Sequence, residues 1–144
     1  MKIAIEAQRI FRPDKHGMDF VALETIRELQ KRNDGNEYYI IVAPGADRCL
    51  KESANLSIVE VACPTYPLWE QTALPLAVKR LGADLLHCTS NTAPLCCPVP
   101  LVLTLHDIIY LEPRLHRSPS LYQEMGWHYR RLTVPRILKK CRKI

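Results

Sequence analysis

Short runs of β-forming residues alternate with helical stretches along this chain, and the alternation limits the fold more than any other feature. The β-forming runs are rich in β-branched or aromatic residues and cover 2–7, 37–43, 56–62, 84–88 and 101–105. Helical spacing of apolar residues predicts helices over 17–32 and 70–81 and from Pro119 onward, where Pro135 should kink or divide the helix. The sequence therefore predicts an α/β fold, a parallel sheet of five strands with helices on both faces.

Chain length and the distribution of apolar residues exclude membrane-spanning, secreted and disordered classes. With 144 residues, 47% hydrophobic and 24% charged, the chain has the composition of one soluble globular domain. Its longest apolar stretches, such as 98–105, are far shorter than the roughly 20 residues that cross a bilayer. Charge appears too early in Met1–Glu6 for a secretory signal. We therefore expect a cytoplasmic protein.

Six cysteines are scattered along the chain without a C-x-x-C pair. Cys96 and Cys97 could form a zinc site with His87 and His106, because zinc prefers thiolate and imidazole ligands. The spacing gives that site little support, and free thiols in a reducing compartment are the simpler interpretation. We therefore predict no metal site.

The net charge of +5 belongs to the C-terminal segment alone. Residues 1–129 contain thirteen basic and fifteen acidic residues, a net charge of −2, whereas Arg130–Lys143 contains seven basic residues and no acidic one. A uniformly basic surface is therefore lacking, and we expect no specific nucleic-acid binding. Three interpretations of Arg130–Lys143 stay open: a solvated helix face, a peripheral contact with anionic lipid at the inner face of the cell membrane, or a non-specific nucleic-acid contact.

Polar residues suited to binding or catalysis follow three of the predicted strands, and open parallel sheets bind ligands at the carboxyl ends of their strands. These residues are His16 and Gly17 after the first strand, Ser90 and Asn91 after the fourth, and His106 and Asp107 after the fifth. Gly17 could let a phosphate or sugar approach a helix start, and His106 could donate a hydrogen bond or carry a proton. Each also has a structural interpretation, as a turn residue or as a His–Asp pair that stabilises a loop.

Three segments of the sequence resemble a known family. They are MKIAIEAQRIFRPDKHGMDFVALETIREL (1–29), PTYPLWEQTALPLAVKRLGADLLHCTSNTAPL (64–95) and VPLVLTLHDIIYLEP (99–113). Together, W-E-Q-x-x-L-P and T-L-H-D are similar to the N-terminal, acceptor-binding half of retaining GT-B glycosyltransferases of family four, of the mannosyltransferase type. The resemblance implies a Rossmann-like parallel sheet that forms one half of a GT-B architecture.

The same resemblance assigns roles to individual residues. His106 matches the family's H-D histidine, which lies near the transferred sugar, and Asp107 would support its loop. Gly17 matches the glycine of the first loop, close to the donor phosphate and the acceptor; many members carry two glycines there, whereas this chain has His16 before it. Ser90 and Asn91 would face the acceptor.

The function that the resemblance implies is hexosyl transfer from a nucleotide sugar to a glycan or lipid-linked acceptor, in polysaccharide biosynthesis, with no cofactor beyond the donor substrate. Members hold the nucleotide sugar mostly through a C-terminal domain, which residues 1–144 do not contain. We therefore expect a truncated N-terminal domain that is inactive alone. The alternative is a non-enzymatic sugar-binding or regulatory module that pairs with another chain.

Overall fold

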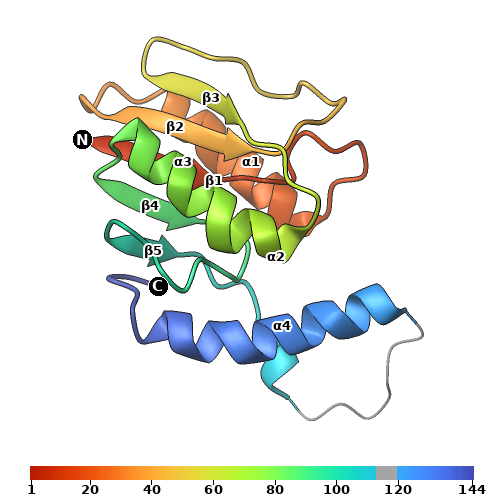
Figure 1. Ribbon diagram of the computed structural model, residues 1–144. Coiled ribbons are helices and arrows are strands. Elements are labelled where there is room, and N and C mark those ends of the chain that lie inside the picture. The colour runs from red at the N-terminus through yellow and green to blue at the C-terminus, as the bar shows by residue number, and fades with distance from the viewer. Residues whose placement is uncertain (113–119) are drawn as a thin grey trace.

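The computed structural model of the chain describes residues 1–112 and 120–144 and contains the predicted five-stranded parallel sheet (Figure 1). The strands are β1 (Lys2–Glu6), β2 (Glu37–Val42), β3 (Leu56–Glu60), β4 (Leu85–Cys88) and β5 (Leu101–Leu103). All four neighbouring pairs are parallel, in the order β3-β2-β1-β4-β5. The α/β prediction is therefore confirmed.

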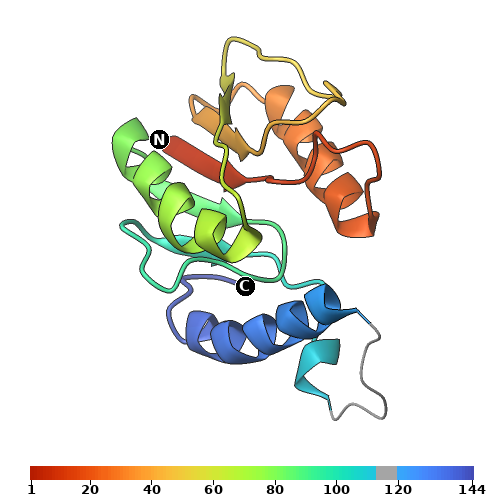
Figure 2. The same ribbon diagram turned by 45° about the vertical axis from the view of Figure 1, so that its right-hand side comes forward.

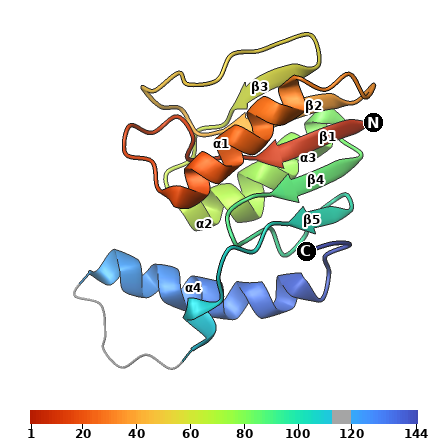
Figure 3. The same ribbon diagram turned by 180° about the vertical axis from the view of Figure 1, so that it is seen from behind.

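Helices cover both faces of the sheet. Helix α1 (Gly17–Gln30) lies on one face, as Figure 3 shows from behind, and the helical stretch between β3 and β4 lies on the other (Figure 1). That stretch comprises α2 (Tyr66–Leu68), the π-helical turn η1 (Trp69–Ala73) and α3 (Leu74–Leu81). It begins four residues before the predicted start at Glu70. The sequence pattern missed this beginning because Pro64 and Pro67 resemble loop residues there, although proline is well tolerated in a first helical turn.

After β5 the described chain forms a short 3₁₀ helix, η2 (Ile109–Leu111), and then α4 (Leu121–Leu138). The predicted start at Pro119 lies outside the described residues. Pro135 lies inside α4 without dividing it, so of the two predicted outcomes, a kink or a division, the division is wrong and the kink stays a prediction. Val134 and Ile137, which flank Pro135, are fully buried, and this packing holds the turn in place.

Two apolar clusters fill the space between the sheet and its helices. On the α1 face the large buried side chains include Ile5, Phe11, Ile26 and Ile40. On the opposite face they include Trp69, Leu74, Leu86, Leu103 and, from α4, Ile137. Neighbouring strand residues such as Ala4 and Ile5 therefore point to opposite clusters, as the pleat requires.

The strand order reverses between β1 and β4. From β1 the chain proceeds to β2 and β3 on one side, then returns to β4 and β5 on the other. Ligands of open parallel sheets bind beside such a reversal, at the carboxyl ends of the strands. We call this side of the sheet the carboxyl edge; the loops that follow β1, β4 and β5 all lie there.

The loop between β1 and α1 is braced by the loop after β2. A Cβ on Gly45 would lie 2.2 Å from the carbonyl oxygen of Phe11, so only glycine permits this approach. Asp47 N–H donates to the same oxygen (3.0 Å), and the Asp47 carboxylate pairs with Lys15. The guanidinium of Arg48 lies 5.1 Å from the centre of the Phe11 ring. These contacts fix the first loop at the carboxyl edge.

The C-terminal residues return from α4 to the free side of β5 (Figure 2). Arg142 N–H donates to Leu101 O (2.8 Å), and Leu103 N–H donates to Lys143 O (3.1 Å). This parallel bridge, together with buried Ile137, attaches α4 to the sheet. Among the described helices, none is both long and apolar enough to cross a membrane.

Candidate functional site

His106, Asn91 and Asp107 form one hydrogen-bonded group at the carboxyl edge. Asn91 Oδ1 accepts the backbone N–H of His106, and Asn91 Nδ2 donates to Asp107 Oδ2 (3.3 Å). Asp107 Oδ1 in turn accepts the N–H of Ile109 (3.3 Å). The structure thus brings together three of the six predicted residues, from the loops after two neighbouring strands.

The His106 ring has a defined tautomer. Its Nε2 lies 2.8 Å from the carbonyl oxygen of Thr89. A carbonyl oxygen only accepts hydrogen bonds, so Nε2 carries the proton, and in the neutral ring Nδ1 is an acceptor. No residue of 1–112 or 120–144 bonds to Nδ1. The half-buried ring therefore keeps one acceptor available to a hydroxyl group.

The β4 loop holds Asn91 in an uncommon backbone conformation. Its φ of 62° lies in the left-handed region, which asparagine tolerates better than most residues. Asn91 N–H donates to Thr104 O (3.3 Å), and Thr104 N–H donates to Cys88 O (2.8 Å), so the pairing of β4 with β5 continues into both loops. Asn91 and Ser90 are both buried. Asn91 positions the His106 loop. Sugar binding by Ser90 and Asn91 stays a prediction.

His16 and Gly17 are both exposed at the start of α1. His16 N–H donates to Asp19 Oδ2 (2.8 Å), which caps the helix. A Cβ on Gly17 would meet nothing within 4 Å, so no protein contact requires glycine there. Among the described residues, no hydrogen bond or ion pair connects His16 or Gly17 with His106. Their predicted role in substrate binding stays a prediction.

Sequence analysis missed a buried carboxylate beside this group. Glu70, in the π-helical turn, is fully buried and accepts four hydrogen bonds. Its Oε1 accepts from Tyr66 OH (2.7 Å) and Thr92 Oγ1, and its Oε2 accepts from Tyr129 OH and Gln71 Nε2 (3.1 Å). Tyr66 comes from the α2 turn, Thr92 from the β4 loop and Tyr129 from α4, and Gln71 neighbours Glu70 in η1, so one side chain connects the helical stretch, the β4 loop and α4.

Burial raises the pKa of Glu70, while the hydroxyl groups of Thr92, Tyr129 and Tyr66 act in the opposite direction. Burial also raises the pKa of Tyr66 and of Tyr129, which keeps both phenols protonated and able to donate. A buried carboxylate without such donors would be strongly unfavourable. The buried carboxylate therefore needs the hydroxyl groups as donors, and the hydroxyl groups need the carboxylate as their acceptor.

The other two residues of the W-E-Q motif also have structural roles. Trp69 is fully buried, and its Nε1 donates to Val61 O (2.8 Å). Gln71 Nε2 donates to Ala93 O (3.2 Å), and Gln71 Oε1 accepts the N–H of Leu95 (2.9 Å). The motif therefore anchors the β4 loop to the helical stretch. In the sequence, the W-E-Q motif contributed only to the family resemblance, which did not indicate this structural role.

A second buried carboxylate, Glu6, lies at the end of β1. It accepts the N–H groups of Gln8 (3.0 Å) and Thr89 (3.2 Å), and Thr89 Oγ1 donates to Glu6 O (2.7 Å). Thr89 O is also the acceptor for His106. The ends of β1 and β4 are thereby joined directly beneath the His106 group.

The zinc alternative receives no support from the described residues, where no three His, Cys, Asp or Glu side chains group to hold a metal ion. His87 Nε2 lies 2.8 Å from Thr104 Oγ1, and burial lowers the pKa of His87. His87 is therefore a neutral histidine that bonds to the end of the neighbouring strand β5.

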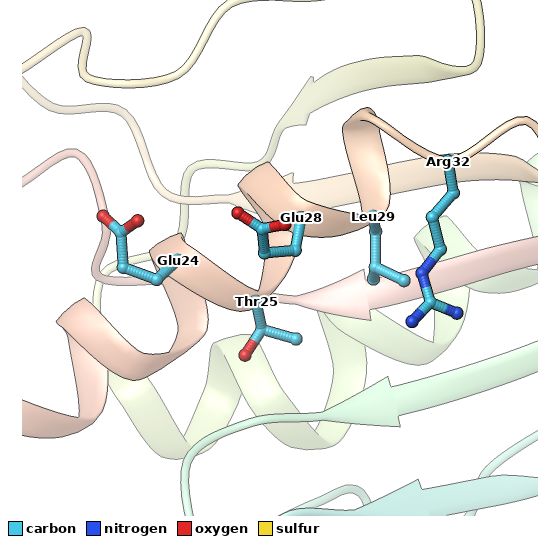
Figure 4. Close-up of a pocket in the computed structure, with 5 residues that line it drawn as sticks. All are labelled: Glu24, Thr25, Glu28, Leu29 and Arg32. Atoms are coloured by element: carbon cyan, nitrogen blue, oxygen red, sulfur yellow. The ribbon is translucent and has the colours of Figure 1, made fainter.

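Two open hollows in the described part of the chain lie away from the carboxyl edge. One, of about 380 Å³, runs along the second half of α1 and the turn that follows (Figure 4). It is lined by Glu24, Thr25, Glu28, Leu29 and Arg32. Because α1 starts at the carboxyl edge and runs back, this half lies toward the amino ends of the strands. The other hollow lies between α3 and residues 96–98. Topology and convergent polar groups, rather than hollow size, therefore identify the candidate site.

Removing the Glu70 carboxylate should destabilise the chain strongly. Glu70→Ala leaves buried hydroxyl groups without their acceptor and should lower the free energy of unfolding by about 3–5 kcal/mol, measured by urea denaturation. Tyr129→Phe removes one of the four donors and should cost about 1–2 kcal/mol. The matched control is Tyr39→Phe, since Tyr39 OH donates to exposed Glu37 and should contribute less than about 0.5 kcal/mol. Equal effects of the three substitutions would contradict the role of Glu70.

Comparison with protein families places this geometry in a known context. Residues 16–144, all but the first fifteen, match the family described as Glycosyltransferase Family 4. A comparison with curated proteins gives no match. The matched range contains the W-E-Q motif and the His106 group, and the parallel sheet with helices on both faces agrees with one half of a GT-B architecture. The chain therefore belongs to glycosyltransferase family 4.

Proposed function

We propose that this chain is the acceptor-binding half of a retaining hexosyltransferase of the mannosyltransferase type. The donor would be a nucleotide sugar, and the acceptor would be a glycan or lipid-linked sugar of a polysaccharide pathway. The reaction would take place at the cytoplasmic face of the membrane. The observation that carries the proposal is the His106 group, which lies in the family-matched range at the carboxyl edge. Membership of the family supports the reaction class.

In this proposal the chain's own residues bind and orient the sugar. Thr89 O holds the Nε2 proton of His106, and Nδ1 accepts a hydrogen bond from a sugar hydroxyl. Asn91 and Asp107 hold the loop in the required position. A second α/β domain would bind the nucleotide sugar, because residues 1–144 alone cannot enclose the donor and exclude water. The chain alone is then inactive.

His106→Ala tests this function. The substitution removes one hydrogen bond to the sugar and should weaken binding of hexose-containing disaccharides to the 144-residue chain by about fivefold, measured by calorimetry. In a protein that contains both domains, turnover should fall by about 10²–10³-fold if the ring also stabilises the transition state.

The matched control is His128→Ala, because His128 lies exposed on α4, where it contacts Glu124 and Trp127 of the same helix. That substitution should leave both binding and turnover unchanged. If His106→Ala also changed neither, His106 would be a structural residue. Saccharide binding without transfer in a two-domain protein would favour the non-enzymatic alternative.

We also propose a peripheral membrane contact through Arg130–Lys143 and the outward face of α4. Leu121, Met125 and Leu132 are 78%, 62% and 57% exposed. Their spacing places them on one face of α4 together with Arg136 and Lys139, opposite buried Ile137. An exposed apolar stripe beside basic residues suits an anionic lipid surface.

Vesicle sedimentation tests the membrane contact. The chain should bind vesicles with anionic lipid more strongly than neutral vesicles, since each basic residue near the surface contributes about 1 kcal/mol. The double substitution Arg136→Glu and Lys139→Glu should reduce binding at least tenfold. The control pair, Lys31→Glu and Arg80→Glu, makes the same charge change on α1 and α3 and should have little effect. Equal reduction by both pairs would leave only a general charge effect and contradict the contact.

A further inference from the structure

The loop between β1 and α1 contains two arginines that share one carboxylate. Arg12 Nη2 lies 2.8 Å from Asp19 Oδ2, and Arg9 Nε lies 3.6 Å from Asp19 Oδ1. Asp19 is 3% exposed, whereas Arg9 and Arg12 are 21% and 31% exposed. The third cation of the loop, Lys15, is already paired with Asp47. Two partly exposed guanidinium groups, with a charge of +2, therefore share one carboxylate with a charge of −1.

Neither guanidinium makes a hydrogen bond within the described residues. Nε of Arg9, Nε of Arg12 and Nη2 of Arg12 are buried and lack an aligned acceptor among residues 1–112 and 120–144. Buried donors without aligned acceptors are costly, and the ion pairs with the single carboxylate of Asp19 offset only part of that cost. The side chains of Arg9 and Arg12 nevertheless remain partly exposed, so a ligand at the carboxyl edge can reach them.

The position of Arg9 connects the pair with the His106 group. Its guanidinium lies 5.6 Å from the centre of the Tyr66 ring, and Tyr66 OH lies 2.8 Å from Thr92 Oγ1. Thr92 follows Asn91, which binds the N–H of His106. The arginines come from the loop after β1 and the His106 group from the loops after β4 and β5. They therefore lie on the two sides of the strand-order reversal, where ligands bind in this fold.

The chemistry of the pair indicates an oxyanion. A planar guanidinium binds phosphate oxygens through two parallel hydrogen bonds, and two such groups fixed side by side suit a phosphoryl group. The loop is held rigid by Gly45 and Asp47, so little ordering is needed on binding. The start of the 14-residue helix α1 adds a favourable partial positive charge.

We propose that Arg9 and Arg12 bind a phosphoryl group of the sugar substrate. Assignment of that group to a sugar substrate rests on the proposed function, whereas the oxyanion site itself does not. The phosphoryl group could belong to a sugar phosphate on the acceptor side or to the diphosphate of the nucleotide sugar, and the two sources are separated by the probes below.

The test is NMR titration of the 144-residue chain, with the arginine Nε–H signals of Arg9 and Arg12 assigned through Arg9→Lys and Arg12→Lys. Inorganic phosphate should shift both signals to saturation. Arg9→Gln keeps the Arg12–Asp19 pair and should fold, and it should weaken phosphate binding by about tenfold. Arg80→Gln makes the same charge change at an exposed position of α3 and should leave the affinity within twofold.

Two further probes identify the source of the phosphoryl group. Tighter binding of a hexose phosphate than of inorganic phosphate would support an acceptor-side sugar phosphate, and tighter binding of a nucleoside diphosphate would support the donor. A failure of all probes to shift the Arg9 and Arg12 signals would overturn the proposal, as would equal weakening by Arg9→Gln and Arg80→Gln. The two proposals can fail separately. If phosphate binds to Arg9 and Arg12 but His106→Ala changes neither saccharide binding nor turnover, the oxyanion site stands and only the proposed function is contradicted.

Discussion

The buried Glu70 carboxylate connects the β4 loop and α4 to the helical stretch between β3 and β4 through hydrogen bonds. Its partners Thr92 and Tyr129 lie 22 and 59 residues away in sequence, in the β4 loop and in α4. Desolvation of a carboxylate is costly, so the fold is stable only when the donors are in place. The position of the β4 loop, and with it that of His106, therefore depends on one hydrogen-bonded carboxylate.

The arrangement at the carboxyl edge follows from this constraint and from topology. The chain reverses its strand order between β1 and β4, and Glu6 and Thr89 join the two strand ends at that point. The β1 loop contributes positive charge, whereas the β4 and β5 loops contribute a hydrogen-bonded histidine. In the proposed function, a charged group and a neutral hydroxyl of one sugar substrate would be recognised on opposite sides of the reversal.

The sequence was sufficient to predict the fold because its signals are local. Each strand lies within its predicted range, since β-forming composition and turn residues act over a few positions. Long-range interactions were not predictable in the same way. Nothing in the local pattern around Glu70 indicates Tyr129, and Pro135 looked like a helix break because its buried neighbours are visible only in three dimensions. The candidate residues after β4 and β5 were predicted to share an edge, but the hydrogen bonds that orient His106 were not.

Hydrogen exchange in the Glu70→Gln variant is the most direct test of the claim that one carboxylate holds both the His106 loop and α4. Exchange should accelerate together at the amides of Asn91 and His106 and in the α4 turn around Tyr129, while the amides of β2, on the far side of β1, keep their protection. Faster exchange in α4 alone, with Asn91 and His106 unchanged, would contradict the account and show that the His106 loop is held independently.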